Sequence, residues 1–160
     1  MAQVRSGGLG VKRAKRYGAF MATDVDDANS IRTSVQALAK HNDEIKLILT
    51  GIIDFDAGAV TDEPQFDIAA ASLVVQTAHD CGRKVFAHCS GEKGLVVAVG
   101  AGVDAIEHGF FMSREILARI GDKWSPLLLM LLDTGSFRHA TLRRLVETLA
   151  TERHISQRML

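Results

Sequence analysis

The chain reads KVFAH at residues 84–88 and VDAIEHG at residues 103–109, two short apolar runs that each lead to a histidine. The glycine-punctuated segment between them predicts a turn, a short helix and a tight turn. The 108 − 88 = 20 residues from His88 to His108 therefore fit a strand–helix–strand unit with two parallel neighbouring strands. Because parallel α/β folds bind ligands at the carboxyl ends of their strands, we expect the two imidazoles side by side at that rim.

The same alternation of apolar runs and helical patterns extends upstream of this unit. Residues 45–50 are apolar at almost every position, as expected of a parallel strand that is covered on both faces. Aspartates offer cap oxygens to a helix over about 24–40, and Asp67 caps a second helix that stops at Gly82. The connection over residues 51–64 is longer than usual, which favours a functional loop.

We divide the chain into three segments. Residues 1–16 are glycine-rich and basic, and we expect them to be flexible or cut; residues 17–151 form the barrel-like domain, and residues 152–160 a frayed tail. The domain's outer elements are predicted at residues 17–23 (strand), 115–120 (helix, capped by Ser113), 124–132 (strand) and 142–149 (helix). About five β-α units without antiparallel hairpin signals predict an α/β fold, made of parallel β/α units of an incomplete TIM-type (β/α)8 barrel.

Charge and cysteine content exclude several function classes. Nineteen basic and nineteen acidic residues cancel over 160 residues, which argues against nucleic acid and against an anionic membrane surface as partners. No apolar run approaches membrane-spanning length, and the N-terminus lacks the apolar core of a signal peptide. Cys81 and Cys89 have no metal-motif spacing, which favours free thiols. We therefore expect a soluble, cytoplasmic protein.

Lys46 is unusual because it lies inside an apolar strand. Burying an ammonium there is costly unless the side chain points into a polar centre, and burial favours the neutral amine. A neutral amine can act as a nucleophile, form a Schiff base, or react with carbon dioxide to give a carbamate that two metal ions can share. The alternative is that Lys46 extends from the end of the strand into solvent.

Two interpretations of His88 and His108 stay open. They are metal ligands at adjacent strand ends, or they are half-buried imidazoles that hydrogen-bond without a metal. Glu107 should face the other side of the sheet by strand alternation and serve as a structural partner there. The remaining histidines are predicted to be surface residues: His41, His79, His139 and His154.

Three stretches carry a family resemblance: Ile45-Lys46-Leu47 with Thr50-Gly51, AHDCGRKVFAH at residues 78–88, and AGVDAIEHG at residues 101–109. They resemble the amidohydrolase superfamily, within it the branch of imidazolonepropionase-like enzymes and Xaa-Pro or Xaa-Arg dipeptidases. The resemblance implies a (β/α)8 barrel that hydrolyses a small amide or dipeptide with one or two divalent metals, often zinc. It also implies that Lys46 is a carboxylated lysine bridging the metals and that His88 and His108 are metal ligands. The metals would activate a bound water and polarise the scissile carbonyl.

The chain also departs from the family pattern. It has no His-x-His pair for a first strand and no segment that matches the aspartate of the eighth strand, so no catalytic residue is assigned. Ile52 stands where a second glycine is usual, and Leu127 where a threonine is usual. Three ligands can hold one zinc, at partial occupancy, but cannot build a binuclear centre. We therefore expect a central piece of an amidohydrolase.

Two functions follow from this sequence. The first is a metal-dependent hydrolase of amide or peptide C–N bonds, in which this chain carries only part of the active site. The second is a non-catalytic α/β barrel fragment without metal, a scaffold that self-associates into a homo-oligomer through its open sheet edges. Whether the chain is an enzyme by itself stays open.

Overall fold

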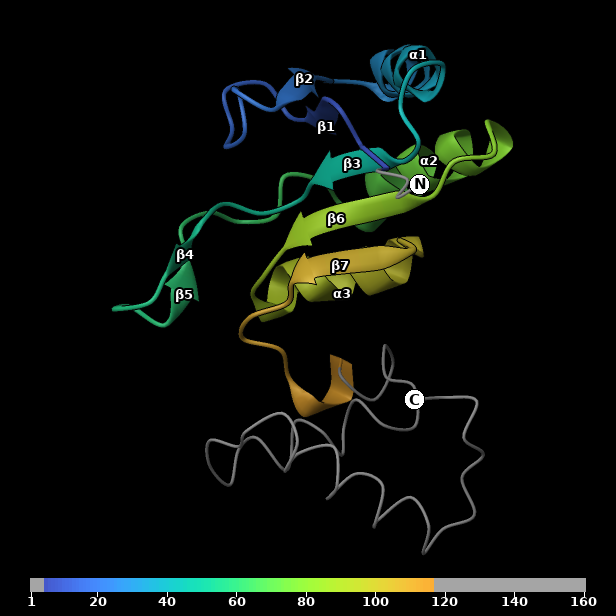
Figure 1. Cartoon of the computed structure of the whole chain (residues 1–160). Coiled ribbons are helices and arrows are strands. Elements are labelled where there is room, and N and C mark those ends of the chain that lie inside the picture. Colours follow the sequence, from blue (N-terminus) through green and yellow to red (C-terminus); the bar gives the residue numbers. More distant parts are fainter. Residues whose placement is uncertain (1–4, 117–160) are drawn as a thin grey trace, which may run out of the picture. The chain divides into compact units, whose positions relative to one another are not determined.

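The computed structural model describes residues 5–116, which form a five-stranded parallel sheet with helices on one face (Figure 1). The order of the strands is β2-β1-β3-β6-β7. Their bounds are β1 Gly10–Lys12, β2 Ala22–Asp24, β3 Ile45–Ile48, β6 Val85–Cys89 and β7 Ala105–His108. This sheet confirms the predicted α/β class with parallel β/α units.

Three helices connect these strands: α1 (Ala28–Ala39), α2 (Ile68–Asp80) and α3 (Glu92–Ala101). The predicted caps of the first two are present, since Asp27 accepts a hydrogen bond from the Ser30 N–H and Asp67 from the Ala70 N–H, both at 2.7 Å. At the end of α3, Gly102 takes the left-handed conformation with φ +75°, which a side chain would make costly. Local sequence thus sets where the helices that cover the sheet begin and end.

The two faces of the sheet have different chemistry. Alternate strand residues face the helices and are fully buried with them: Ile45, Leu47, Val85, Ala87 and Cys89 from β3 and β6, and Ile31, Val35, Ala71, Val74, Leu95 and Ala98 from the helices. The intervening residues, such as Lys46, Ile48 and His88, point to the opposite face. In a barrel of this type, that face looks inward and its upper rim carries the chemistry.

The assignment of residues 1–16 as a flexible or cut segment is wrong for its second half. Strand β1 lies there, between β2 and β3, and all three of its residues are buried. A Cβ on Gly10 would come within 2.6 Å of the Lys46 carbonyl oxygen, so only glycine permits this approach of β1 to β3. The sequence of β1 has one apolar side chain, between a glycine and a lysine, and this is too short to predict a strand. Pairing with β2 on one edge and β3 on the other stabilises β1 instead.

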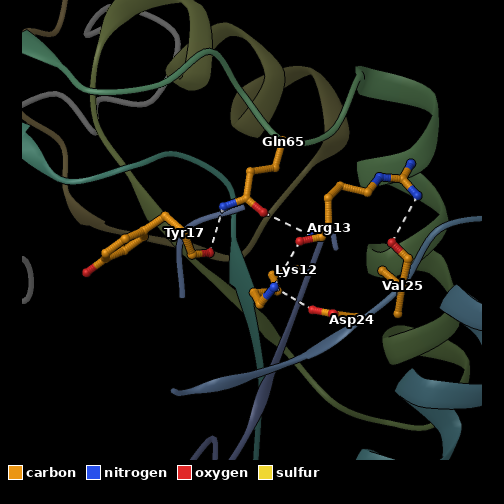
Figure 2. A network of polar contacts seen from close by, with 6 residues as sticks. All are labelled: Lys12, Arg13, Tyr17, Asp24, Val25 and Gln65. Atoms are coloured by element: carbon orange, nitrogen blue, oxygen red, sulfur yellow. Dashed lines mark hydrogen bonds and ion pairs between the residues drawn. The ribbon is translucent and has the colours of Figure 1, made fainter. Parts of the chain in front are cut away.

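Buried polar side chains fix the loop that follows β1 (Figure 2). Lys12 is 2% exposed; its ammonium pairs with Asp24 and donates to the Arg13 carbonyl at 3.0 Å. The Gln65 amide, also buried, accepts from the Arg13 N–H and donates to the Tyr17 carbonyl, each at 3.0 Å. The loop is thereby attached to the segment that leads into α2, which determines where Tyr17 lies.

Two further predictions about connections need correction. The loop over residues 51–64 contains an antiparallel hairpin of β4 (Ile53–Asp54) and β5 (Ala59–Val60), although no hairpin signal was predicted. Asp54 forms the turn by accepting from two backbone N–H groups, a signal that sequence reading could have used. The strand predicted at 17–23 is reduced to β2, because residues before it form a turn.

Several predictions concern residues that the structure does not describe. The strand at 124–132, the helix at 142–149 and the tail at 152–160 all lie outside the described residues. The cap that Ser113 was expected to provide for the helix predicted at 115–120 is present, since Ser113 accepts from the Ile116 N–H at 3.3 Å. Among residues 5–116, no helix combines the length and the apolar character needed to cross a membrane.

Candidate metal centre

The candidate site lies at the carboxyl ends of three neighbouring strands, β3, β6 and β7. The register places Ile48 beside His88 and His88 beside Glu107, so their side chains point to the same face of the sheet. Lys46, two residues before Ile48, points to that face as well. The structure thus gathers one ammonium, one carboxylate and two imidazoles at one rim.

The backbone holds His88 in one tautomer. Its Nε2 lies 3.3 Å from the Gly51 carbonyl oxygen, which can only accept, so Nε2 carries the proton and Nδ1 keeps its lone pair. Burial lowers the pKa of His88 below its ordinary value, and the neighbouring His108 adds to the decrease. The Tyr17 ring packs against this imidazole with the centroids 5.4 Å apart. His88 is therefore neutral near pH 7 and presents Nδ1 to the rim.

His108 stands at the point where strand β7 ends in a tight turn. Its φ is +73°, and the Gly109 N–H donates to the Glu107 carbonyl at 3.1 Å across it, as in a γ-turn. The same N–H donates to the Cys89 carbonyl at 3.0 Å, which keeps the turn paired to β6. His108 Nε2 then lies 3.0 Å from His88 Nδ1. The histidine pair expected from the sequence is brought together.

The expectation that Glu107 faces away from this site is wrong. Alternation would put Glu107 and His108 on opposite faces, but the left-handed backbone at His108 interrupts it. Both side chains therefore reach the same group, and one ligand atom each from His88, Glu107 and His108 lie within 4.8 Å of one another. Sequence reasoning missed Glu107 because it assumed regular strand geometry up to the last residue.

Lys46 contacts the carboxylate of this group. Its Nζ lies 2.7 Å from Glu107 Oε2, and the side chain passes 5.2 Å from the centre of the Phe86 ring. The lysine side chain is 22% exposed and the glutamate 37%, so the pair is partly shielded from water. Of the two alternatives for Lys46, the polar centre rather than free solvent describes its surroundings.

The remaining histidines and cysteines of the described chain lie elsewhere. His79, predicted to be a surface residue, is partly exposed and lies 2.8 Å from Asp104, which also accepts from the Val85 N–H. Burial raises the pKa of Asp104, but these two hydrogen bonds outweigh it and the net pKa is lowered. Cys89 is buried, which raises its thiol pKa to about 12 and leaves it unreactive. His139 and His154 lie outside the described residues.

The spacing of the ligand atoms fits a single metal ion. Two nitrogens bound to one tetrahedral zinc at its usual bond length are about 3.3 Å apart. His88 Nδ1 and His108 Nε2 need to move by only a few tenths of an ångström from their 3.0 Å separation. The hydrogen bond from His88 Nε2 to the Gly51 carbonyl also resembles those that orient imidazole ligands in metal sites, where the ring nitrogen that does not bind the metal donates to a carbonyl or carboxylate.

Sequence comparison finds relatives of this chain in mycobacteria. No family model matches the chain. It is 28% identical over 130 residues to uncharacterized proteins of Mycobacterium bovis and Mycobacterium tuberculosis; the match covers 81% of this chain and 35% of each relative. The chain thus spans about a third of the length of the curated relatives it matches.

Solved structures supply the more informative likeness. A Xaa-Pro dipeptidase crystallised with methionine in its active site is 34% identical, with a TM-score of 0.53 over 60% of this chain and 24% of its own. Ochratoxinase from A. niger has a TM-score of 0.64 over 89% of this chain and 41% of its own, but at 17% identity it supports the fold alone. The similar structures include prolidases and an amidohydrolase, and together they confirm the predicted fold type.

Proposed function

We propose that this chain carries part of the active site of a metal-dependent hydrolase of amide or peptide C–N bonds. The observation that carries the proposal is the pair of nitrogens 3.0 Å apart, His88 Nδ1 and His108 Nε2, at the carboxyl ends of adjacent parallel strands. Imidazole nitrogens at this spacing suit zinc. The likeness to a Xaa-Pro dipeptidase supports the reaction class.

In this proposal, the chain's own residues prepare the site. A bound zinc would activate a water molecule and polarise the substrate carbonyl. His88 keeps its lone pair on Nδ1 because Gly51 holds the proton at Nε2. His108, whose Nε2–H now donates to that lone pair, would move its proton to Nδ1 to become the second ligand. The Tyr17 ring shields one side of His88 from water.

The resemblance assigns a third ligand to Lys46 as a carbamate, and this stays a proposal. The reaction joins the neutral Nζ to the carbon of carbon dioxide and releases one proton, so the present ion pair with Glu107 must first open. An intact-mass measurement under gentle conditions tests it. A carbamate would appear as an excess of one carbon dioxide that is absent from Lys46→Arg.

The substrate class follows from the same likeness. We propose a small amide or dipeptide, with Xaa-Pro dipeptides as the first compounds to test. Aromatic rings stand on the loops of the same rim, where Phe55 from the hairpin and Phe110 after β7 meet edge to face at 5.4 Å. Both are exposed, at 70% and 44%, and would receive an apolar substrate side chain. We place this activity in the cytoplasm because both cysteines are free.

The test combines metal analysis with turnover. The purified full chain should bind about one zinc and hydrolyse at least one Xaa-Pro dipeptide, and both properties should be lost in His88→Ala and in His108→Ala. His41→Ala is the matched control, because this exposed histidine lies between α1 and β3, at the amino end of the strand rather than at its carboxyl end. Failure to bind any offered zinc would overturn the metal site, while binding without any hydrolysis would overturn the reaction.

A specific observation favours a second function, self-association. Within the described residues, β7 pairs only with β6, and exposed apolar side chains follow it: Phe110 and Phe111. Open strand edges template further pairing. Sedimentation of the chain between low and high micromolar concentration should show assembly that does not depend on zinc, and a monomer throughout would contradict this function.

A further inference from the structure

Glu107 has a place in the site that the resemblance does not give it, because the register sets it beside His88. We propose that its carboxylate is the third ligand of a mononuclear site with His88 Nδ1 and His108 Nε2, and that Lys46 positions this carboxylate. The inference rests on the proposed function and names the ligand set of that same site. It makes a carbamate on Lys46 unnecessary.

The first argument is the donor set. The three ligand atoms lie within 4.8 Å of one another, which is close enough for one ion to reach all of them after small side-chain movements. Two imidazoles and one carboxylate form a common set for catalytic zinc and leave the fourth position open to water. Lys46 by contrast makes its 2.7 Å contact with Glu107 Oε2.

The second argument is the backbone at His108. A non-glycine residue with φ near +73° is strained, and such strain persists where a function needs the resulting geometry. Here the turn has one clear effect, which is to bring two consecutive side chains, Glu107 and His108, to the same face. The register already places Glu107 on the face of His88, and the turn brings His108 to that face, so all three side chains share one face only because of this turn.

The third argument is the manner in which Lys46 holds Glu107. The ammonium binds one carboxylate oxygen at 2.7 Å, and the other oxygen remains for a metal. Because both side chains are more than half buried, the pair limits the rotamers that Glu107 can adopt. Outer contacts of this kind orient metal ligands and change affinity without touching the ion.

The test measures the zinc affinity of the full chain by competition with a chromophoric chelator in bicarbonate-free buffer. We expect Glu107→Gln, which keeps the side chain's shape, to weaken zinc binding by more than about 100-fold, and Lys46→Met by about 10-fold, as for an outer contact. Glu92→Gln, an exposed glutamate at the start of α3, is the control and should bind as the parent does. Circular dichroism spectra confirm that each variant is folded.

Cobalt(II) gives a readout that does not depend on activity. Its absorption bands in the parent should change in Glu107→Gln and persist, at higher cobalt concentration, in Lys46→Met. Zinc binding that needs bicarbonate, disappears in Lys46→Met and survives in Glu107→Gln would overturn the inference and leave the proposed hydrolase intact. Unchanged zinc affinity in His88→Ala would instead overturn the proposed metal centre itself.

Discussion

Lys12 and Lys46 lie on neighbouring strands of one sheet, and each pairs with a carboxylate from another strand. Lys12 is almost completely buried, and its second contact is a backbone carbonyl, so its surroundings are closed. Lys46 is 22% exposed, and the carboxylate it contacts belongs to a group with two imidazoles. The buried lysine has two partners in closed surroundings, whereas the partly exposed lysine borders the group that we propose as a metal site.

The largest effect on stability is expected at the pair of Lys12 and Asp24. Lys12→Met would remove the charged donor to the Arg13 carbonyl in a buried region and reduce the free energy of unfolding by about 3 kcal/mol, whereas Asp24, at 53% exposure, would be hydrated. Lys46→Met should cost at most about 1 kcal/mol, because the Lys46 side chain is itself 22% exposed and its ammonium stays partly hydrated. Urea denaturation of the two variants measures both values. Equal losses would contradict the difference drawn between the two lysines.

The next effect concerns the amide that supports the loop with Tyr17. Gln65→Leu would leave the Arg13 N–H and the Tyr17 carbonyl unpaired in a buried region and reduce the free energy of unfolding by about 2 kcal/mol. Gln76→Leu is the matched control, since this exposed amide contacts only Asp80 on its own helix. The same urea experiment should show little change for the control. A small loss of unfolding free energy for both variants would show that Gln65 does not stabilise the loop.

The contribution of the candidate site to stability should also depend on pH, through His88. Burial lowers the pKa of His88 in the folded state, so the unfolded chain binds more protons as the pH falls through about 6.5. The contribution of His88 is therefore fully present above that pH and is lost below it. Denaturation midpoints from pH 8 to pH 5 should fall more steeply for the parent than for His88→Gln. Parallel curves would mean that His88 titrates alike in both states.

The smallest effect is expected at a third pair, which lies fully in water. Lys93 contacts Glu63, and their side chains are 75% and 67% exposed. Lys93→Met should change the free energy of unfolding by less than about 0.5 kcal/mol, because solvent and salt screen such pairs. The three lysines would then rank by burial. A loss at Lys93 as large as that at Lys46 would break this order.

Periodicity was sufficient to predict most of the described fold. The apolar runs of β3 and β6 and the capped patterns of α1 and α2 are signals that act within a few residues, and the structure contains all four. The β6–α3–β7 unit follows from its length and its glycines. These elements are encoded locally, so a single sequence reveals them.

The misses have a different physical origin. Strand β1 depends on pairing with two later segments, β2 and β3, rather than on a pattern of its own, and on the close approach that Gly10 permits. Register with His88 places Glu107 at the rim, and one dihedral angle at His108 turns that imidazole to the same face, against alternation. The two histidines were correctly expected at one rim, but the carboxylate between them and Lys46 was not.

The positive φ of His108 also restricts how this sequence can change over generations. β-branched residues are strongly disfavoured at that angle, whereas glycine, asparagine and aspartate adopt it more readily. A descendant that lost the imidazole would therefore be expected to keep the turn by accepting one of these three residues. The turn would then persist without the imidazole, and asparagine at this position in a related chain would indicate that the proposed metal site is absent there.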